Sequence, residues 1–168
     1  MKDLYISWDE YNRLVEKLAL EVWKSGWSFD AVVCLARGGL RVGDVFSRLF
    51  DKPLGVLFTS SYRDDEGVTQ GGLLIGEQLS SAQPLPGPRW LLVDDLADTG
   101  ETLLGVLPAL RERYPQAHEI RSAVLWRKGS SAVQPDYFIE HLPTNPWIHQ
   151  PFEEYDHMRP ADLKARWG

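Results

Sequence analysis

The segment from Trp90 to Thr102 constrains the fold of this chain more than any other. It opens with four apolar residues, Trp90–Val93, continues with the acids Asp94 and Asp95, and ends in the run Asp-Thr-Gly-Glu-Thr at 98–102. A short apolar run of this kind is typical of a strand covered on both faces, as in a parallel sheet. The glycine and hydroxyl residues then indicate the start of a helix, whose unpaired backbone N–H groups bind anions such as phosphate. The segment therefore predicts a strand–turn–helix unit with an anion site at the helix start.

The carboxylates of this segment need a separate explanation, because a negative charge beside a phosphate repels it. Asp94 and Asp95 can accept hydrogen bonds from sugar hydroxyls, or face a divalent cation that accompanies the phosphates. A plainer alternative is that Asp98 and Thr99 only cap a helix and the two acids form a solvated turn. A cap accounts for one carboxylate or one hydroxyl, but not for the whole pattern. We therefore favour a site that binds phosphate at one end and a diol at the other, as a ribose phosphate requires.

Composition sets the broad class of protein. The length of 168 residues predicts a single domain, 1–168, and the contents of 43% hydrophobic and 25% charged residues argue against disorder. The net charge of −6 argues against nucleic-acid or anionic-membrane partners, which favour a basic face. Cys34 is the only cysteine, and neither a signal peptide nor a run of about 20 apolar residues is apparent. These features predict a soluble, cytoplasmic protein.

Apolar runs alternate with amphipathic segments along the chain. Strands are expected at 31–36, 54–60, 72–79, 90–93, 119–126 and 136–140. Helices are expected from Ser7 to about Gly26 and at 103–113. A further helix is expected to carry Val42, Val45, Phe46 and Leu49 on one face. Such alternation indicates βαβ units around a mainly parallel sheet. The chain from His141 onward is rich in proline and aromatic residues and has no clear period.

The run from Val93 to Thr102 resembles the diphosphate-sugar signature of the type I phosphoribosyltransferases, which use 5-phosphoribosyl-1-pyrophosphate (PRPP). It lacks the Gly-Lys-Ser/Thr of a Walker loop and the three spaced glycines of a dinucleotide fingerprint. The resemblance implies an α/β fold, with a mainly parallel twisted sheet flanked by helices and a small hood contributed by about 141–168. It also implies that PRPP is bound by the residues of this run: Asp94, Asp95, Asp98, Thr99, Gly100, Glu101 and Thr102.

Arg37, Gly38 and Gly39 follow the predicted strand 31–36, at the strand end where open α/β sheets bind ligands. Glycines let backbone N–H groups approach an anion, and an arginine adds charge-assisted hydrogen bonds. Taken alone, this segment is equally consistent with an ordinary Gly-Gly turn. Beside the central run it resembles the family's pyrophosphate loop, in which a non-proline cis peptide bond is expected between Ala36 and Arg37.

Ser61 and Tyr62 match the Ser-Tyr pair of the family's flexible loop, which closes over PRPP and excludes water. On sequence alone the stretch that follows them is simply a polar connection between two strands.

The last third of the chain resembles the purine-specific members of the family. Lys128 stands where a lysine contacts the exocyclic oxygen of a 6-oxopurine, although Arg127 is adjacent and the alignment could slip by one. Within 147–153, Trp147 would stack on the base and the Ile148 backbone would meet its edge. Glu153 occupies the position where the family has an acid near the metal. Trp147 could instead serve core or interface packing.

The resemblance implies transfer of the phosphoribosyl group of PRPP to a 6-oxopurine (hypoxanthine, guanine or xanthine), giving the purine 5′-monophosphate and pyrophosphate in purine salvage. Asp98 and Arg37 would be catalytic, and Mg²⁺ would be held near Asp94, Asp95 and Glu153. A homo-oligomer, dimer or tetramer, is expected. Two alternatives stay open: a nucleotide-sensing regulator of the same fold, and a phosphoribosyltransferase for another base.

Overall fold

A computed structural model describes residues 3–63 and 70–168, with the backbone alone described at 61–63, 70 and 71. The helices are α1 (Trp8–Lys24), α2 (Leu40–Phe50), α3 (Glu101–Arg113), α4 (Glu154–His157) and α5 (Pro160–Trp167). The strands are β1 (Leu4–Tyr5), β2 (Ala31–Ala36), β3 (Leu54–Arg63), β4 (Gln70–Ile75), β5 (Arg89–Val93), β6 (Leu96–Ala97), β7 (Glu119–Lys128), β8 (Tyr137–Leu142) and β9 (Ile148–His149).

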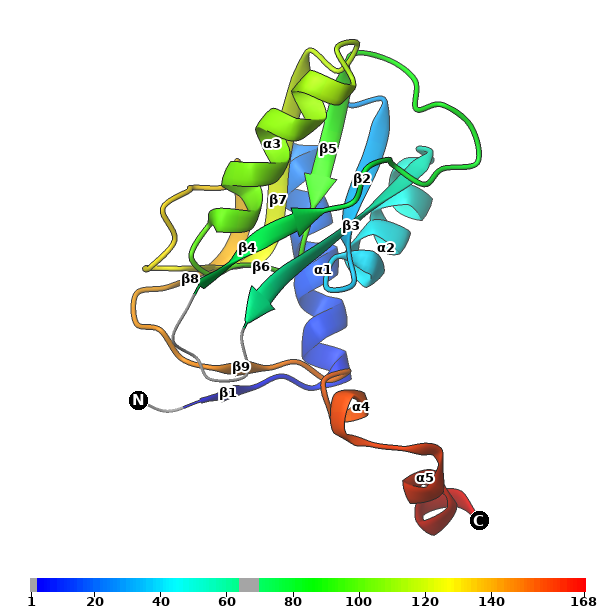
Figure 1. Ribbon diagram of the computed structural model, residues 1–168, viewed down its shortest axis with the longest axis vertical. Helices are drawn as coiled ribbons and strands as arrows, with labels where there is room; N and C mark the ends of the chain where they lie inside the picture. The colour runs from blue at the N-terminus through cyan, green and yellow to red at the C-terminus, as the bar shows by residue number, and fades with distance from the viewer. Residues whose placement is uncertain (1–2, 64–69) are drawn as a thin grey trace.

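The main sheet has the strand order β4-β3-β2-β5-β7-β6, and β8 also pairs with β7. All of these pairings are parallel except that of β3 with β4. Helices α1 and α2 cover one face of the sheet and α3 covers the other (Figure 1). The predicted fold class, a mainly parallel sheet flanked by helices, is confirmed.

Burial on both faces explains why the central strands are continuously apolar. In β2, Val32 and Cys34 pack in the cluster beneath α1 and α2, whereas Val33 and Leu35 pack in the cluster beneath α3. Successive side chains of a strand point to opposite faces, so both sets must be apolar when helices cover both faces. The same burial raises the pKa of the Cys34 thiol to about 11.

The helix starts follow local chemistry. Ser7 and Glu10 form the capping box expected at α1, because the Glu10 N–H donates to Ser7 Oγ and the Ser7 N–H donates to Glu10 Oε2, each at 3.2 Å. The predicted place of Leu49 on the same face of α2 as Val42 and Phe46 is wrong, since Leu49 is 61% exposed. Phe46 is buried instead, and the partly buried Phe50 packs against Phe29 with ring centroids 4.9 Å apart.

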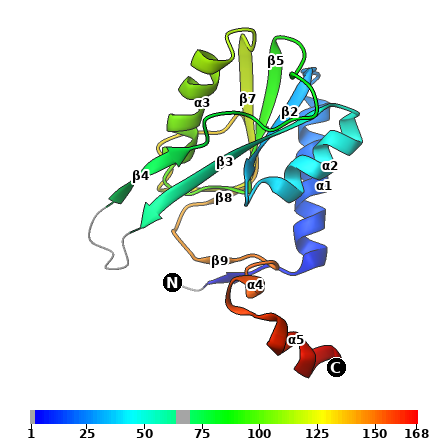
Figure 2. The same cartoon turned by 45° about the vertical axis from the view of Figure 1, so that its right-hand side comes forward.

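A second, two-stranded sheet lies across the carboxyl ends of the main strands (Figure 2). It pairs β1 with β9 in parallel, with Leu4 opposite Ile148 and Tyr5 opposite His149. We call the segment made of β1 and residues 147–157 the hood. The hood predicted from about 141–168 did not include β1, because a strand of two residues shows no hydrophobic period in the sequence.

Helix α5 extends away from the body of the molecule beyond α4 (Figures 1 and 2), and all of its residues are exposed. In the part of the chain that the structure describes, no helix combines the length and apolarity required to cross a membrane.

Candidate active site

The site forms where β2 and β5 end side by side. The two strands pair in parallel with Cys34 opposite Val93, so the loops that follow them meet. Gly39 lies so close to the other loop that a Cβ there would be 2.7 Å from the Val93 carbonyl oxygen and 2.8 Å from that of Leu35. Only a glycine fits between two backbones at this distance, which explains the second glycine of the Arg37-Gly38-Gly39 loop.

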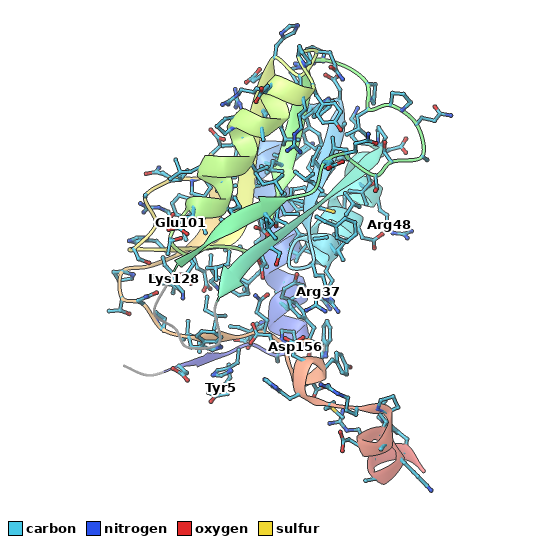
Figure 3. The ribbon with its side chains drawn as sticks, viewed as in Figure 1. Tyr5, Arg37, Arg48, Glu101, Lys128 and Asp156 are labelled. Carbon is cyan, nitrogen blue, oxygen red and sulfur yellow. The ribbon has the colours of Figure 1, made fainter. Side chains whose placement is uncertain are left out.

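Gly38 brings the same loop against Asp95. A Cβ at Gly38 would lie 2.7 Å from Asp95 Oδ1, so the backbone of this loop contacts the carboxylate directly. The peptide bond between Ala36 and Arg37 is cis, as predicted from the family resemblance. The Arg37 guanidinium is exposed and lies 3.7 Å from Asp156 at the hood, beside which Figure 3 shows it.

The start of α3 lines the same cleft as this loop. Gly100 has φ +85°, a conformation that favours glycine, and the first helical hydrogen bond runs from Leu104 N to Gly100 O at 3.0 Å. The N–H groups of Thr102 and Leu103 therefore have no acceptor within the helix and are available to an anion. A cleft of about 350 Å³ lies here, which we call the phosphate cleft. Its walls include Arg37, Gly38, Asp94, Asp95, Asp98, Thr99, Gly100 and Thr102.

Asp94 and Asp95 lie on one wall of the phosphate cleft. The Asp95 N–H donates to Asp94 Oδ1 at 2.9 Å. Burial, and then the charge of Asp95, raises the pKa of Asp94 well above its usual value. A partly buried acid with a raised pKa favours partners that donate hydrogen bonds or carry positive charge, such as ribose hydroxyls or a cation.

Asp98 makes an ion pair with Lys128. The Lys128 ammonium lies 3.1 Å from Asp98 Oδ2, and its side chain is 6% exposed against 39% for Asp98. The loop after β7 packs on the same turn, because Ser130 Oγ donates to Asp98 O at 3.1 Å and Ala132 N to Thr99 O at 2.8 Å. The carboxylate predicted to take a proton and the lysine predicted to contact the base therefore form one unit.

A second and larger cleft, of about 1380 Å³, lies beneath the hood. We call it the hood cleft. Trp147 lines it and is 52% exposed, so one face of its indole is available to a flat ligand. Arg37, Gly38 and Asp95 line both clefts, which therefore adjoin at these residues.

Glu153 also lines the hood cleft, and burial raises its pKa. In the described ranges, no group of three or more His, Cys, Asp or Glu side chains is arranged to hold a metal ion by itself. Asp94, Asp95 and Glu153 thus do not form a complete protein cage. Magnesium usually takes only one or two carboxylates and obtains its other ligands from phosphates and water, so Asp94 and Asp95 suit a metal that arrives with a phosphorylated ligand.

The structure brings together most, but not all, of the predicted site residues. Ile148 is 4% exposed within β9 and lines neither cleft. Glu101 is exposed on α3 (Figure 3) and lines neither cleft. Ser61 and Tyr62 lie at the end of β3, where side chains are outside the described residues. Lys128 reaches the phosphate cleft only through Asp98.

Sequence reasoning missed three neighbours of the site. Gln150 donates from Nε2 to Asp95 Oδ2. Arg41 lies 4.2 Å from the ring centroid of Phe152, which attaches α2 to the hood. Tyr5 stacks on His149 with centroids 4.3 Å apart. Gln150 and Phe152 fall inside the segment 147–153, which pointed to that region, whereas nothing in the sequence marks Tyr5.

Residues 7–157 match the family model described as a phosphoribosyl transferase domain, and the chain belongs to this family. Among the curated relatives, it is 27% identical to a xanthine-guanine phosphoribosyltransferase from Idiomarina loihiensis over 93% of this chain and 90% of the relative. A protein of the same name from Chromohalobacter salexigens is 29% identical over 88% of this chain and 82% of the relative. Among solved structures, the xanthine-guanine-hypoxanthine phosphoribosyltransferase of Helicobacter pylori is similar with a TM-score of 0.76, at 25% identity over 98% of this chain and 99% of that chain.

Proposed function

We propose that this protein transfers the 5-phosphoribosyl group of PRPP to a 6-oxopurine, giving the purine 5′-monophosphate and pyrophosphate. The observation that carries the proposal is the pair of adjoining clefts. The phosphate cleft offers the N-terminus of α3 at one end and a pair of acids at the other, and the hood cleft offers an exposed indole. The relatives named xanthine-guanine phosphoribosyltransferase support the same activity.

In this proposal the 5′-phosphate binds at residues 98–102, where N–H groups and the hydroxyls of Thr99 and Thr102 meet the phosphate cleft. Asp94 and Asp95 accept hydrogen bonds from the ribose hydroxyls. Arg37, which lines both clefts, stabilises the departing pyrophosphate. Bound Mg²⁺ would neutralise pyrophosphate charge as it develops, held through Asp94 and Asp95 and the oxygens of PRPP itself.

The base would enter the hood cleft and stack on Trp147, with its edge at the Ile148 backbone. Lys128 has three N–H donors and uses one on Asp98; in this proposal, Asp98 holds the ammonium beside the base and a second N–H donates to the purine 6-oxygen. Asp98 then accepts the proton that leaves a ring nitrogen of the purine. A lysine donor at this place selects oxopurines over adenine, whose 6-amino group is itself a donor.

The test is a panel assay with purified protein, magnesium and PRPP against hypoxanthine, guanine, xanthine, adenine, uracil and orotate, with pyrophosphate release as the readout. Turnover with one or more 6-oxopurines and none with adenine is expected. Turnover confined to orotate or uracil would overturn the assignment of the hood cleft and keep the PRPP site. PRPP binding without turnover on any base would favour a nucleotide-sensing regulator.

The same proposal includes the organisation of the molecule: one domain over 1–168, a homo-oligomer and a cytoplasmic location. Tyr5 and Trp167 are 74% and 80% exposed, and large exposed aromatic side chains suit an interface between copies. The free thiol of Cys34 suits a reducing compartment. Light scattering coupled to size-exclusion chromatography distinguishes a dimer or tetramer from a monomer.

A further inference from the structure

Gln150 connects the hood to the acid pair. It follows β9 directly, lines the hood cleft and is 6% exposed. Its Nε2 donates a hydrogen bond to Asp95 Oδ2, across 55 residues of sequence. A buried glutamine is uncommon, and it usually has hydrogen bonds to all of its polar atoms.

The other end of this amide is left without a partner. Within the described part of the chain, Gln150 Oε1 is buried and makes no hydrogen bond. Turning the amide over would place that oxygen against the Asp95 carboxylate, where two acceptors repel each other. The amide orientation is therefore set by Asp95, although a buried oxygen stays unpaired as a result. The hydrogen bond to Asp95 therefore leaves the other end of the amide unsatisfied, which indicates a role for Gln150 other than stabilising the fold.

Three further contacts hold Asp95 in place. Its carbonyl oxygen accepts from Leu125 N at 2.9 Å, and its N–H donates to Asp94. Its Oδ1 faces the Gly38 backbone. The two hydrogen bonds fix the main chain of Asp95, while Gln150 donates to its second carboxylate oxygen.

We propose that Gln150 is a positioning residue for PRPP binding: from the hood, it holds the Asp95 carboxylate in the orientation that receives the ribose. This inference rests on the proposed function, because it assumes that Asp95 meets PRPP. It goes beyond that function by assigning to a hood residue, next to the base site, control over the affinity for the other substrate.

The test compares Gln150→Met with Gln150→Glu. Methionine has similar length, removes the donor and also removes the unpaired oxygen, so the melting temperature should hold or rise. PRPP affinity with magnesium, measured by isothermal titration calorimetry, should fall about tenfold, the equivalent of one hydrogen bond to a charged group. Glutamate places a further carboxylate beside Asp94 and Asp95 and should weaken PRPP binding more. The matched control is Gln116→Met, on the exposed connection between α3 and β7.

A double-mutant cycle with Asp95→Asn tests whether the effect passes through Asp95. The loss caused by Gln150→Met should largely disappear in the Asp95→Asn background. PRPP affinity within twofold of wild type in Gln150→Met, or an equal loss in both backgrounds, would overturn the inference. If the wild-type protein binds no PRPP, the proposed function itself fails, which is a separate result.

Discussion

Lys128 and Asp98 form an ion pair between a buried cation and a partly exposed anion, 3.1 Å apart, at 6% and 39% exposure. The asymmetry matters because the partner that stays behind after a substitution differs in its access to water. The pair joins the end of β7 to the turn before α3, and it links the residue proposed to select the base with the residue proposed to take its proton.

Asp98→Asn should destabilise the protein more than Lys128→Met. The first change leaves an ammonium buried without its counter-ion, and such losses reach about 3–5 kcal/mol in fully buried pairs. The second change leaves a carboxylate that water can reach, so a cost of about 1 kcal/mol is expected. Urea unfolding of the two variants gives the order, and the reverse order would contradict this account of the pair. The double variant should lose less stability than the sum of the two single changes.

Asp98→Asn should also lower turnover more than it weakens PRPP binding. A carboxylate that accepts a proton in the reaction contributes about 100-fold or more to rate, whereas the backbone of residues 98–102 that would bind the phosphate is unchanged. Steady-state kcat and calorimetric PRPP affinity separate the two effects. Equal losses in both would assign Asp98 to binding alone.

Trp147→Ala should raise the KM for the purine base by about tenfold or more, because stacking of a base on an aromatic ring is worth about 1–3 kcal/mol. The KM for PRPP should change by less than about twofold, a smaller change than any lost hydrogen bond would cause. Trp23, on α1 and 69% exposed, provides the matched control as Trp23→Ala. An unchanged base KM in Trp147→Ala would move this residue from the base site to packing or an interface.

Gly39→Ala should destabilise the protein by about 1–3 kcal/mol, the usual cost of overpacking. Its Cβ would meet two carbonyl oxygens of the backbone, on Leu35 and Val93, which cannot move without disturbing β2 and β5. Gly72→Ala is the control, because a Cβ there has nothing within 4 Å. Thermal unfolding should show a clear loss at position 39 and little change at 72.

Asp94→Asn should raise the stability of the unliganded protein at neutral pH. Burial and the Asp95 charge raise the pKa of Asp94 in the folded state. Between the unfolded pKa, about 3.9, and the higher native pKa, the native state binds more protons than the unfolded chain. Stability therefore falls as pH rises through that window. Asparagine removes this loss, so the variant should melt higher than wild type at pH 7, and the difference should shrink toward pH 4. A lower melting temperature at pH 7 would contradict it.

Local features were readable from the sequence because their causes are local. The apolar run of β5 and the glycine and hydroxyl residues before α3 have their effect within a few residues. The Ser7–Glu10 capping box spans only four. The same reasoning located the loops 37–39 and 94–102, since adjacent parallel strands end at one edge of the sheet.

The contacts that complete the site join residues far apart in sequence. Lys128 reaches Asp98 across 30 residues, Gln150 reaches Asp95 across 55, and β1 pairs with β9 across more than 140. No local pattern encodes such pairs, because each depends on how the sheet, the loop after β7 and the hood pack together. The sequence by itself determined the strand–turn–helix units and the chemical groups they carry. Only the tertiary structure decided which carboxylate faces which donor, because that choice depends on long-range packing and burial.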